Sequence, residues 1–253
     1  MDSNGYLAVF DSGVGGLSVL RHLRKILPDE RYIYYGDCAN APYGARTTEE
    51  VRQLTLAAVE NLLAAYPVKA LVVACNTATA AAIRDLREKY PQRIIIGIEP
   101  ALKLAADHFP GGRIGVMATE VTLREEKFDH LLHRFEAGCA VEKIPAPGLV
   151  ELIEQGWADT PQADALVSSI LAPYVGKLDA LVLGCTHYPF AAKAIARVLG
   201  AQVQLLDGGE GTAKETKRRL EAAGLLRSGG AGDLILTSSG DTEKFTQVAQ
   251  TLL

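Results

Sequence analysis

Short apolar runs alternate along the chain with longer stretches in which apolar residues recur at helical spacing. The apolar runs cover residues 6–10, 31–35, 69–74, 93–98, 113–118, 139–144, 179–184, 202–206 and 233–237. Several are apolar at successive positions, which is typical of strands covered on both faces. The stretches 16–27 and 47–66 place apolar residues at i, i+3, i+4 and i+7. This alternation predicts an α/β fold with mainly parallel sheets flanked by helices.

The second helical stretch carries its own start signal. It opens with Thr47-Thr48-Glu49-Glu50. A hydroxyl side chain can cap the first free amides of a helix, and early acids complement its positive end. We therefore expect a helix to begin at these residues.

Two segments of the sequence repeat the same pattern. "ALVVACNTATAAAI" (70–83) and "ALVLGCTHYPFAAKAI" (180–195) each run from an apolar stretch through a cysteine into an Ala-rich stretch. "LAVFDSGVG" (7–15) likewise resembles "IGVMATEVT" (114–122), at nearly the same separation. Two matches in register predict two pseudo-symmetric α/β lobes with the active site between them. Residues 1–98 plus 209–253 are expected to form the first lobe, and residues 99–208 the second.

The composition excludes several classes of protein. The chain has 253 residues, of which 48% are hydrophobic and 22% charged, as in soluble globular proteins. A net charge of −4 gives no reason to expect a nucleic acid or an anionic membrane as partner. No stretch approaches the ~20 apolar residues of a spanning helix, and "MDSNGYLAVF" has no basic region before an apolar one. A cytoplasmic protein is therefore expected.

The cysteines are expected to be free thiols. There are four of them, and no two stand in a CxxC pair. A reducing compartment disfavours disulfides, and the missing CxxC pair disfavours a structural zinc site. We therefore predict neither a metal nor a disulfide framework.

Polar residues cluster where the predicted strands end. They are Asp11, Ser12, Asp37, Cys75, Asn76, Thr77, Thr119, Glu120, Cys185, Thr186 and His187. In α/β sheets ligands bind at the carboxyl ends of strands, so two facing lobes would form one pocket with a thiol on each side. A helix beginning after each cysteine would favour the thiolate and lower the thiol pKa, with Pro189 fitting the first turn of the second helix. His187 is close enough in sequence to exchange protons with Cys185.

The first loop also allows a nucleotide-binding interpretation. Gly13-x-Gly15-x-x-Ser18 comes within one residue of the dinucleotide fingerprint and follows a predicted strand. Asp11 would place negative charge against a pyrophosphate, and the glycines equally permit close backbone approach to a small ligand. An NAD-dependent oxidoreductase is therefore an alternative that the partial fingerprint allows and the charge of Asp11 disfavours. The turn at Tyr43-Gly44 offers a phenol and backbone amides that can hold a carboxylate.

Two opposed thiols without a cofactor suit the inversion of a stereocentre. One thiolate removes the α-proton from one face, and the other thiol returns a proton to the opposite face. Hydrogen-bond donors must stabilise the charge that develops on the carboxylate, and Asn76, Thr77 and Thr186 are suitable donors.

The sequence resembles a known family in five motifs that occur in order over nearly the whole chain. The motifs are "VFDSGVGGLSVL", "YYGDCANAPYG", "ALVVACNTATA", "IGVMATEVT" and "LVLGCTHYPF". They are similar to those of the glutamate racemases in the aspartate/glutamate racemase superfamily. The resemblance implies cofactor-independent interconversion of L- and D-glutamate, which supplies D-glutamate for peptidoglycan, and a protein that often forms homodimers.

The resemblance also implies roles for individual residues. Cys75 would be the base toward D-glutamate, assisted by Asp11, and Cys185 the base toward L-glutamate, assisted by His187 and a glutamate. The implied substrate contacts are Asp11, Ser12, Tyr43, Gly44, Asn76, Thr77, Thr119, Thr186 and His187. The family segment CPLFVPLVE corresponds here to "IPAPGLVEL" (144–152), whose shared "LVE" maps the assisting acid to Glu151. Cys38 and Cys139 are expected to be bystanders.

Two further alternatives stay open at this stage. A racemase of the same superfamily acting on aspartate or another amino acid would carry similar motifs, because pocket contacts decide the length of side chain accepted. A non-catalytic amino-acid-binding protein on this scaffold would be expected to lack one thiol, whereas Cys75 and Cys185 both stand in intact motifs.

Overall fold

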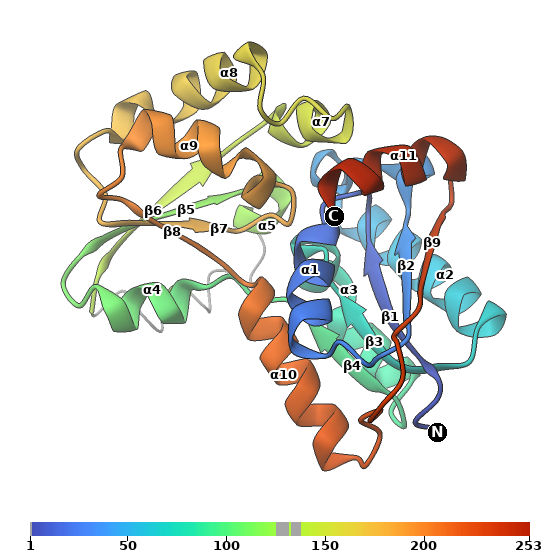
Figure 1. The fold of residues 1–253 in the computed structure, drawn as a ribbon. Coiled ribbons are helices and arrows are strands. Elements are labelled where there is room, and N and C mark those ends of the chain that lie inside the picture. Colours follow the sequence, from blue (N-terminus) through green and yellow to red (C-terminus); the bar gives the residue numbers. More distant parts are fainter. Residues whose placement is uncertain (1, 125–131, 133–137) are drawn as a thin grey trace.

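The computed structural model describes residues 2–124, 132 and 138–253, and its strands form two separate parallel sheets (Figure 1). The first sheet has the order β4-β3-β1-β2-β9 and the second the order β6-β5-β7-β8. The strands are β1 (Tyr6–Asp11), β2 (Tyr32–Gly36), β3 (Val68–Val73), β4 (Ile94–Gly97), β5 (Arg113–Ala118), β6 (Ala140–Pro145), β7 (Ala180–Leu183), β8 (Gln204–Asp207) and β9 (Leu234–Ser238). All nine expected strands are present, and their ends differ from the expected ones by at most two residues.

The two sheets share one topology. In the first, β1 lies between β2 and β3 with β4 beyond β3; in the second, β5 lies between β6 and β7 with β8 beyond β7. The first sheet has an additional strand, β9, beside β2. The prediction of two pseudo-symmetric lobes is therefore confirmed, and Cys75 and Cys185 follow the equivalent strands β3 and β7. The exact lobe boundaries at 98/99 and 208/209 stay predictions.

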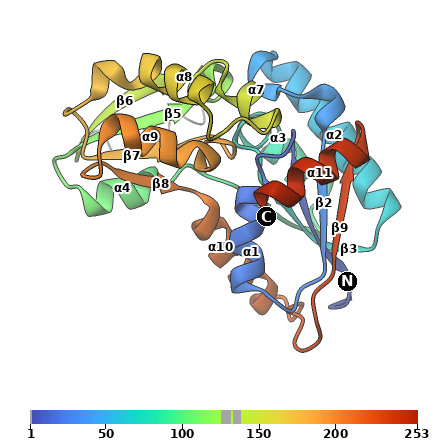
Figure 2. The same cartoon turned by 45° about the horizontal axis from the view of Figure 1, so that its top comes forward.

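Helices flank both sheets (Figures 1 and 2). They are α1 (Leu17–Ile26), α2 (Thr48–Ala65), α3 (Asn76–Lys89), α4 (Leu102–His108), α5 (Glu120–Arg124), α7 (Leu149–Glu154), α8 (Pro161–Leu171), α9 (Ala192–Leu199), α10 (Gly209–Ala222) and α11 (Thr242–Leu252). Four 3₁₀ turns, η1 (Cys38–Asn40), η2 (Tyr43–Ala45), η3 (Ala172–Tyr174) and η4 (Tyr188–Ala191), complete the described elements. Within the described ranges, no helix combines the length and the apolar character needed to span a bilayer.

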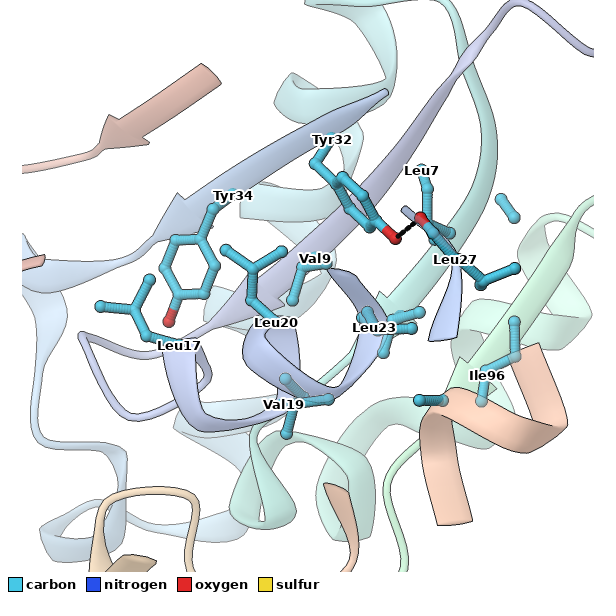
Figure 3. Packing of buried hydrophobic residues seen from close by; sticks show 14 of the residues in the cluster. Leu7, Val9, Leu17, Val19, Leu20, Leu23, Leu27, Tyr32, Tyr34 and Ile96 are labelled. Atoms are coloured by element: carbon cyan, nitrogen blue, oxygen red, sulfur yellow. Dashed lines mark hydrogen bonds between the residues drawn. The ribbon is translucent and has the colours of Figure 1, made fainter. Parts of the chain in front are cut away.

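The core of the first lobe explains the continuous apolar runs. Successive residues of β1 alternate between two hydrophobic clusters, with Leu7 and Val9 on one face and Ala8 and Phe10 on the other. Figure 3 shows the first of these clusters, where side chains of α1 pack against strand residues. Tyr32 is fully buried there, and its hydroxyl donates to the Leu27 carbonyl at 2.8 Å. A strand covered on both faces cannot alternate apolar and polar residues.

The C-terminal segment packs against elements of the first sheet and its helices. β9 pairs in parallel with β2, and α10 packs against α1. Phe245 of α11 stacks on Tyr34 of β2 with ring centroids 5.8 Å apart. In Figure 1, α10 runs from the second lobe down the side of α1.

Candidate active site

The loops after the parallel strands bring the two lobes into contact. The Thr186 hydroxyl, after β7, donates to Asp11 Oδ2, after β1, at 3.0 Å. Thr77, after β3, and Thr119, after β5, have hydroxyl oxygens 3.1 Å apart. The carboxyl ends of parallel strands lie at one edge of a sheet. These edges of the two sheets face each other, so polar residues from both sheets come together. The structure thus unites residues that lie far apart in the sequence.

Cys75 lies at the start of α3, as the sequence predicts. It is the N-cap residue, and the Ala78 N–H points to its Sγ at 3.4 Å. The thiol donates to Ser12 Oγ at 3.6 Å. Burial raises the pKa of the Cys75 thiol to about 12, and the negative charge of Asp11 acts in the same direction. The expected lowering of this pKa is therefore wrong, because burial and a nearby carboxylate outweigh the helix amides.

Cys185 belongs to a hydrogen-bonded chain that ends on a carboxylate. Its Sγ lies 3.6 Å from His187 Nδ1, and His187 Nε2 lies 2.6 Å from Glu154 Oε1. Burial alone would lower the His187 pKa, but the contacts with Cys185 and Glu154 outweigh it and raise that pKa well above its usual value. The contact with His187 in turn holds the Glu154 pKa below its usual value in spite of burial.

Cys185 does not sit at a helix N-terminus. His187 is the N-cap of η4, a short 3₁₀ turn that has Pro189 in its first turn as predicted. The expectation that a helix begins directly after Cys185 is therefore wrong. The polar side chain in contact with the Cys185 sulfur is that of His187.

The carboxylate beside His187 is Glu154 and not Glu151, to which the sequence mapped the assisting acid. Glu154 ends α7, one turn after Glu151. Both acids line a cavity of about 410 Å³ together with Cys38 and Lys244, but it is Glu154 whose carboxylate reaches His187. The two acids stand at i and i+3, a spacing that places both near one face of a helix. Helical spacing therefore fits Glu154 as well as Glu151 and does not choose between them.

Asp11 is fully buried between the two thiol loops. Its carboxylate accepts hydrogen bonds from the Gly13 N–H at 2.9 Å and from the Thr186 hydroxyl at 3.0 Å. Burial raises the pKa of Asp11 to about 6 and the charge of Glu154 adds to this, while His187 and the two hydrogen bonds oppose it. The Asp11 carboxyl therefore holds its proton to a higher pH than an exposed aspartate does.

The Tyr43-Gly44 turn also lies against the second lobe. The Tyr43 hydroxyl donates to Asp37 at 2.5 Å, and the Asn40 amide donates to the same carboxylate at 3.1 Å. A methyl group at Gly44 would come within 2.7 Å of Thr119 Cγ2, so only glycine fits there without a shift. This turn is therefore held firmly near the site.

Two more polar groups lie beside Thr77 and Thr119. The Thr122 hydroxyl lies 3.0 Å from Thr119 Oγ1 and 3.3 Å from Thr77 Oγ1, and the sequence interpretation missed it although it ends the quoted "IGVMATEVT". Asn76 has a buried Oδ1 without a hydrogen-bond partner among the described residues. Such an atom favours a ligand that donates a hydrogen bond.

The remaining cysteines, Cys38 and Cys139, have different surroundings. Cys139 is buried in a hydrophobic cluster with Leu102 and Ile114. Cys38 lines the cavity beside Glu151, and burial raises the pKa of its thiol to about 12. Over residues 2–124 and 138–253, no group of three or more His, Cys, Asp and Glu side chains is arranged to hold a metal ion.

The fold and the site define a two-lobed α/β protein with a buried thiol after each of two equivalent strands, Cys75 after β3 and Cys185 after β7. Residues 16–216 match the family model described as Asp/Glu/Hydantoin racemase. A glutamate racemase of Clostridium acetobutylicum is 45% identical over 252 residues, covering 99% of this chain and 98% of that protein. The chain therefore belongs to the Asp/Glu/hydantoin racemase family.

Solved structures agree with this assignment. The glutamate racemase of Thermus thermophilus in complex with β-chloro-D-alanine gives a TM-score of 0.86 at 39% identity, covering 100% of this chain and 94% of that one. The Escherichia coli glutamate racemase in complex with L-glutamate and the activator UDP-MurNAc-Ala gives 0.86 at 32% identity, covering 97% and 95%.

Proposed function

We propose that this protein interconverts L- and D-glutamate in the cytoplasm without a cofactor and supplies D-glutamate for peptidoglycan. The observation that carries the proposal is the placement of Cys75 and Cys185 after the equivalent strands β3 and β7. Family membership supports a racemase, and the relatives named as glutamate racemases support glutamate over aspartate. The bound L-glutamate of the Escherichia coli relative points the same way.

The reaction moves one proton at each face of the α-carbon. One thiolate takes the α-proton and becomes a thiol, while the electron pair of the broken C–H bond delocalises into the α-carboxylate. The opposite thiol then gives its proton to the other face and becomes the thiolate. The enzyme ends with the two protonation states exchanged, and proton exchange with solvent restores the first state.

The surroundings of the thiols suit one resting arrangement. A Cys75 thiol with a pKa of about 12 keeps its proton at neutral pH. His187, whose pKa is raised by its contacts with Cys185 and Glu154, lies 3.6 Å from the Cys185 sulfur and can exchange a proton with it. Cys185 would therefore remove the proton from L-glutamate, and Cys75 would donate to the opposite face.

The polar groups around the thiols would bind the substrate. Thr77, Thr186 and the Asn76 amide would hold the α-amino and α-carboxylate groups, because donors aimed at the carboxylate stabilise the carbanion. The buried Asn76 Oδ1 is suited to an ammonium group. Ser12, Thr119 and the Tyr43-Gly44 turn would contact the remaining substrate atoms.

Racemisation in D₂O tests the function. Purified protein without added cofactor should invert both L- and D-glutamate, and deuterium should appear at early times almost only in the product enantiomer. Early deuterium in the recovered substrate would indicate one shared base or a thiol that exchanges rapidly with solvent. Faster inversion of aspartate than of glutamate would change the substrate, and inversion of neither would contradict the function.

Single-atom changes at the thiols test the two bases. Cys75→Ser and Cys185→Ser should each lower kcat for glutamate by at least about 10²–10⁴-fold, because a hydroxyl is far too weak an acid to replace a thiol. Cys139→Ser, in a separate cluster, is the matched control and should keep kcat. Near-normal racemisation by either site variant would contradict the two-thiol mechanism.

We also propose that the protein is a homodimer, as the resemblance implies. Sedimentation equilibrium at micromolar concentration should give twice the chain mass, and a monomer at all concentrations would contradict it.

A further inference from the structure

The two carboxylates of the site are each completed by a donor from the opposite lobe. Asp11 follows a strand of the first lobe and accepts a hydrogen bond from Thr186 of the second, at 3.0 Å. Glu154 ends a helix of the second lobe, and its Oε1 accepts the Val14 N–H of the first lobe at 2.9 Å. The same Oε1 lies 2.6 Å from His187 Nε2. Each acid therefore depends on both lobes for its position.

The residues between Asp11 and Ser18, which we name the 11–18 loop, make these contacts. The Ser18 hydroxyl adds a third bond between lobes, to the Thr186 carbonyl at 2.8 Å. A methyl group at Gly13 would overlap Glu154 Oε1, and one at Gly15 would overlap the His187 ring. The glycines thus let the main chain reach the acid–base groups of the other lobe.

The loop is itself supported from the first lobe. The Tyr34 hydroxyl of β2 donates to the Gly13 carbonyl at 2.7 Å, and the Gly13 N–H donates to Asp11. Tyr34 is buried and stacked on Phe245. The peptide groups that face Glu154 are therefore fixed on both sides.

We propose that the 11–18 loop is an interlobe latch in which Gly13 and the Val14 amide position Glu154 against His187, while Thr186 positions Asp11. The proposal deepens the proposed function and rests on it. Lobe separation would remove one hydrogen bond from each acid, so the acid–base groups of both thiols are complete only in the closed molecule. Gly13 is a positioning residue, because it acts on the reaction only through Glu154.

The ionisation of His187 reports on the latch. The titratable groups that face it are Cys185, Glu154 and Asp11. Glu154 raises the His187 pKa, so displacement of this carboxylate must lower it. A displaced loop that left Glu154 in place would not have this effect.

The test compares Gly13→Ala with Gly211→Ala, since a methyl group at Gly211 of α10 meets nothing within 4 Å. The titration midpoint of His187 is followed by NMR of the labelled imidazole. In Gly13→Ala we expect the midpoint to fall by about one pH unit or more, and kcat for glutamate to fall at least about tenfold. Gly211→Ala should match the wild type in both.

The outcomes separate the latch from the function. A folded Gly13→Ala protein that keeps the wild-type His187 midpoint would overturn the latch, whatever its activity. Failure of both the wild type and Gly211→Ala to invert glutamate would overturn the function and leave the His187 comparison valid.

A second pair of variants covers the case in which Gly13→Ala does not fold. Thr186→Ser keeps a hydroxyl that can donate to Asp11, whereas Thr186→Val removes it. The Asp11 carboxyl midpoint, measured by ¹³C NMR, should rise in Thr186→Val and stay at the wild-type value in Thr186→Ser. An unchanged midpoint in Thr186→Val would contradict the role of Thr186 in the latch.

Discussion

The ionised carboxylate of Asp11 is destabilised by burial. Replacing Asp11 by asparagine should therefore raise the stability of the protein while it lowers the activity. Burial raises the pKa of Asp11 from 3.8 to about 6 in the folded protein. The folded state therefore binds the proton more tightly than the unfolded state does, and stability falls as pH rises from about 4 to about 6. Above this window the carboxylate costs about 3 kcal/mol.

Asp11→Asn should therefore unfold at higher urea concentration than the wild type at pH 7.5, with a gain in the free energy of unfolding of up to about 3 kcal/mol. The gain should nearly vanish at pH 4, where the wild-type carboxyl is neutral. The same variant should lose racemase activity, because the amide cannot exchange a proton. The exposed Asp107→Asn serves as control, and equal gains at both pH values would refute the buried charge as the cause.

At the scale of elements, the start of α2 shows a purely local signal at work. The Thr47 side chain accepts the Glu50 N–H at 3.3 Å, and the Glu50 carboxylate accepts the Thr47 N–H at 2.8 Å. The sequence interpretation expected the helix to begin at these residues, and α2 does begin at Thr48. A capping box needs only residues three apart, so it can be read without knowledge of the fold.

Thr47→Ala should lower the free energy of unfolding by about 1 kcal/mol, because the helix loses its hydroxyl cap. Urea denaturation would measure the loss, and kcat for glutamate should stay unchanged since no contact of Thr47 reaches the thiols. Thr47→Ser, which keeps the hydroxyl, should retain most of the stability. A large fall in kcat for Thr47→Ala would show that the start of α2 communicates with the site.

In the short helix α7, the local sequence pattern did not identify the correct acid. Glu151 and Glu154 stand one turn apart, and a sequence motif selected the first while the structure places the second at His187. Helical spacing predicts the face of the helix on which a side chain lies. It does not predict the position along the helix at which the other lobe contacts that face. That position depends on how α7 packs against the 11–18 loop. The sequence of α7 alone does not determine this packing.

At the scale of the whole molecule, a buried ion pair joins distant parts of the first lobe. Lys69 Nζ lies 2.5 Å from Glu30 Oε2 and donates to the Ser3 and Leu225 carbonyls at 2.6 and 2.9 Å. Glu30 also accepts the Arg227 N–H at 2.9 Å. The pair therefore holds the chain start and the segment after α10 against β3.

Lys69→Met should lower the free energy of unfolding by about 3–5 kcal/mol, because it leaves the Glu30 carboxylate buried without its counter-charge. The double variant Lys69→Met/Glu30→Gln should recover part of this loss in thermal or urea denaturation. Lys193→Met, at an exposed ion pair, is the control and should cost less than about 1 kcal/mol. A double variant less stable than Lys69→Met would contradict this account.

The sequence alone determined the alternation of strands and helices, the internal repeat and the thiols at two equivalent strand ends, because these features depend on periodicity and neighbouring residues. Tertiary structure decided that Glu154 contacts His187 and that burial raises the Cys75 pKa. It also decided that Asp11 and Glu154 each accept a hydrogen bond from the opposite lobe. The bonds between the lobes join residues 140 and 175 positions apart, and the contact of His187 with Glu154 spans 33 positions. A linear pattern does not specify how such residues meet in space.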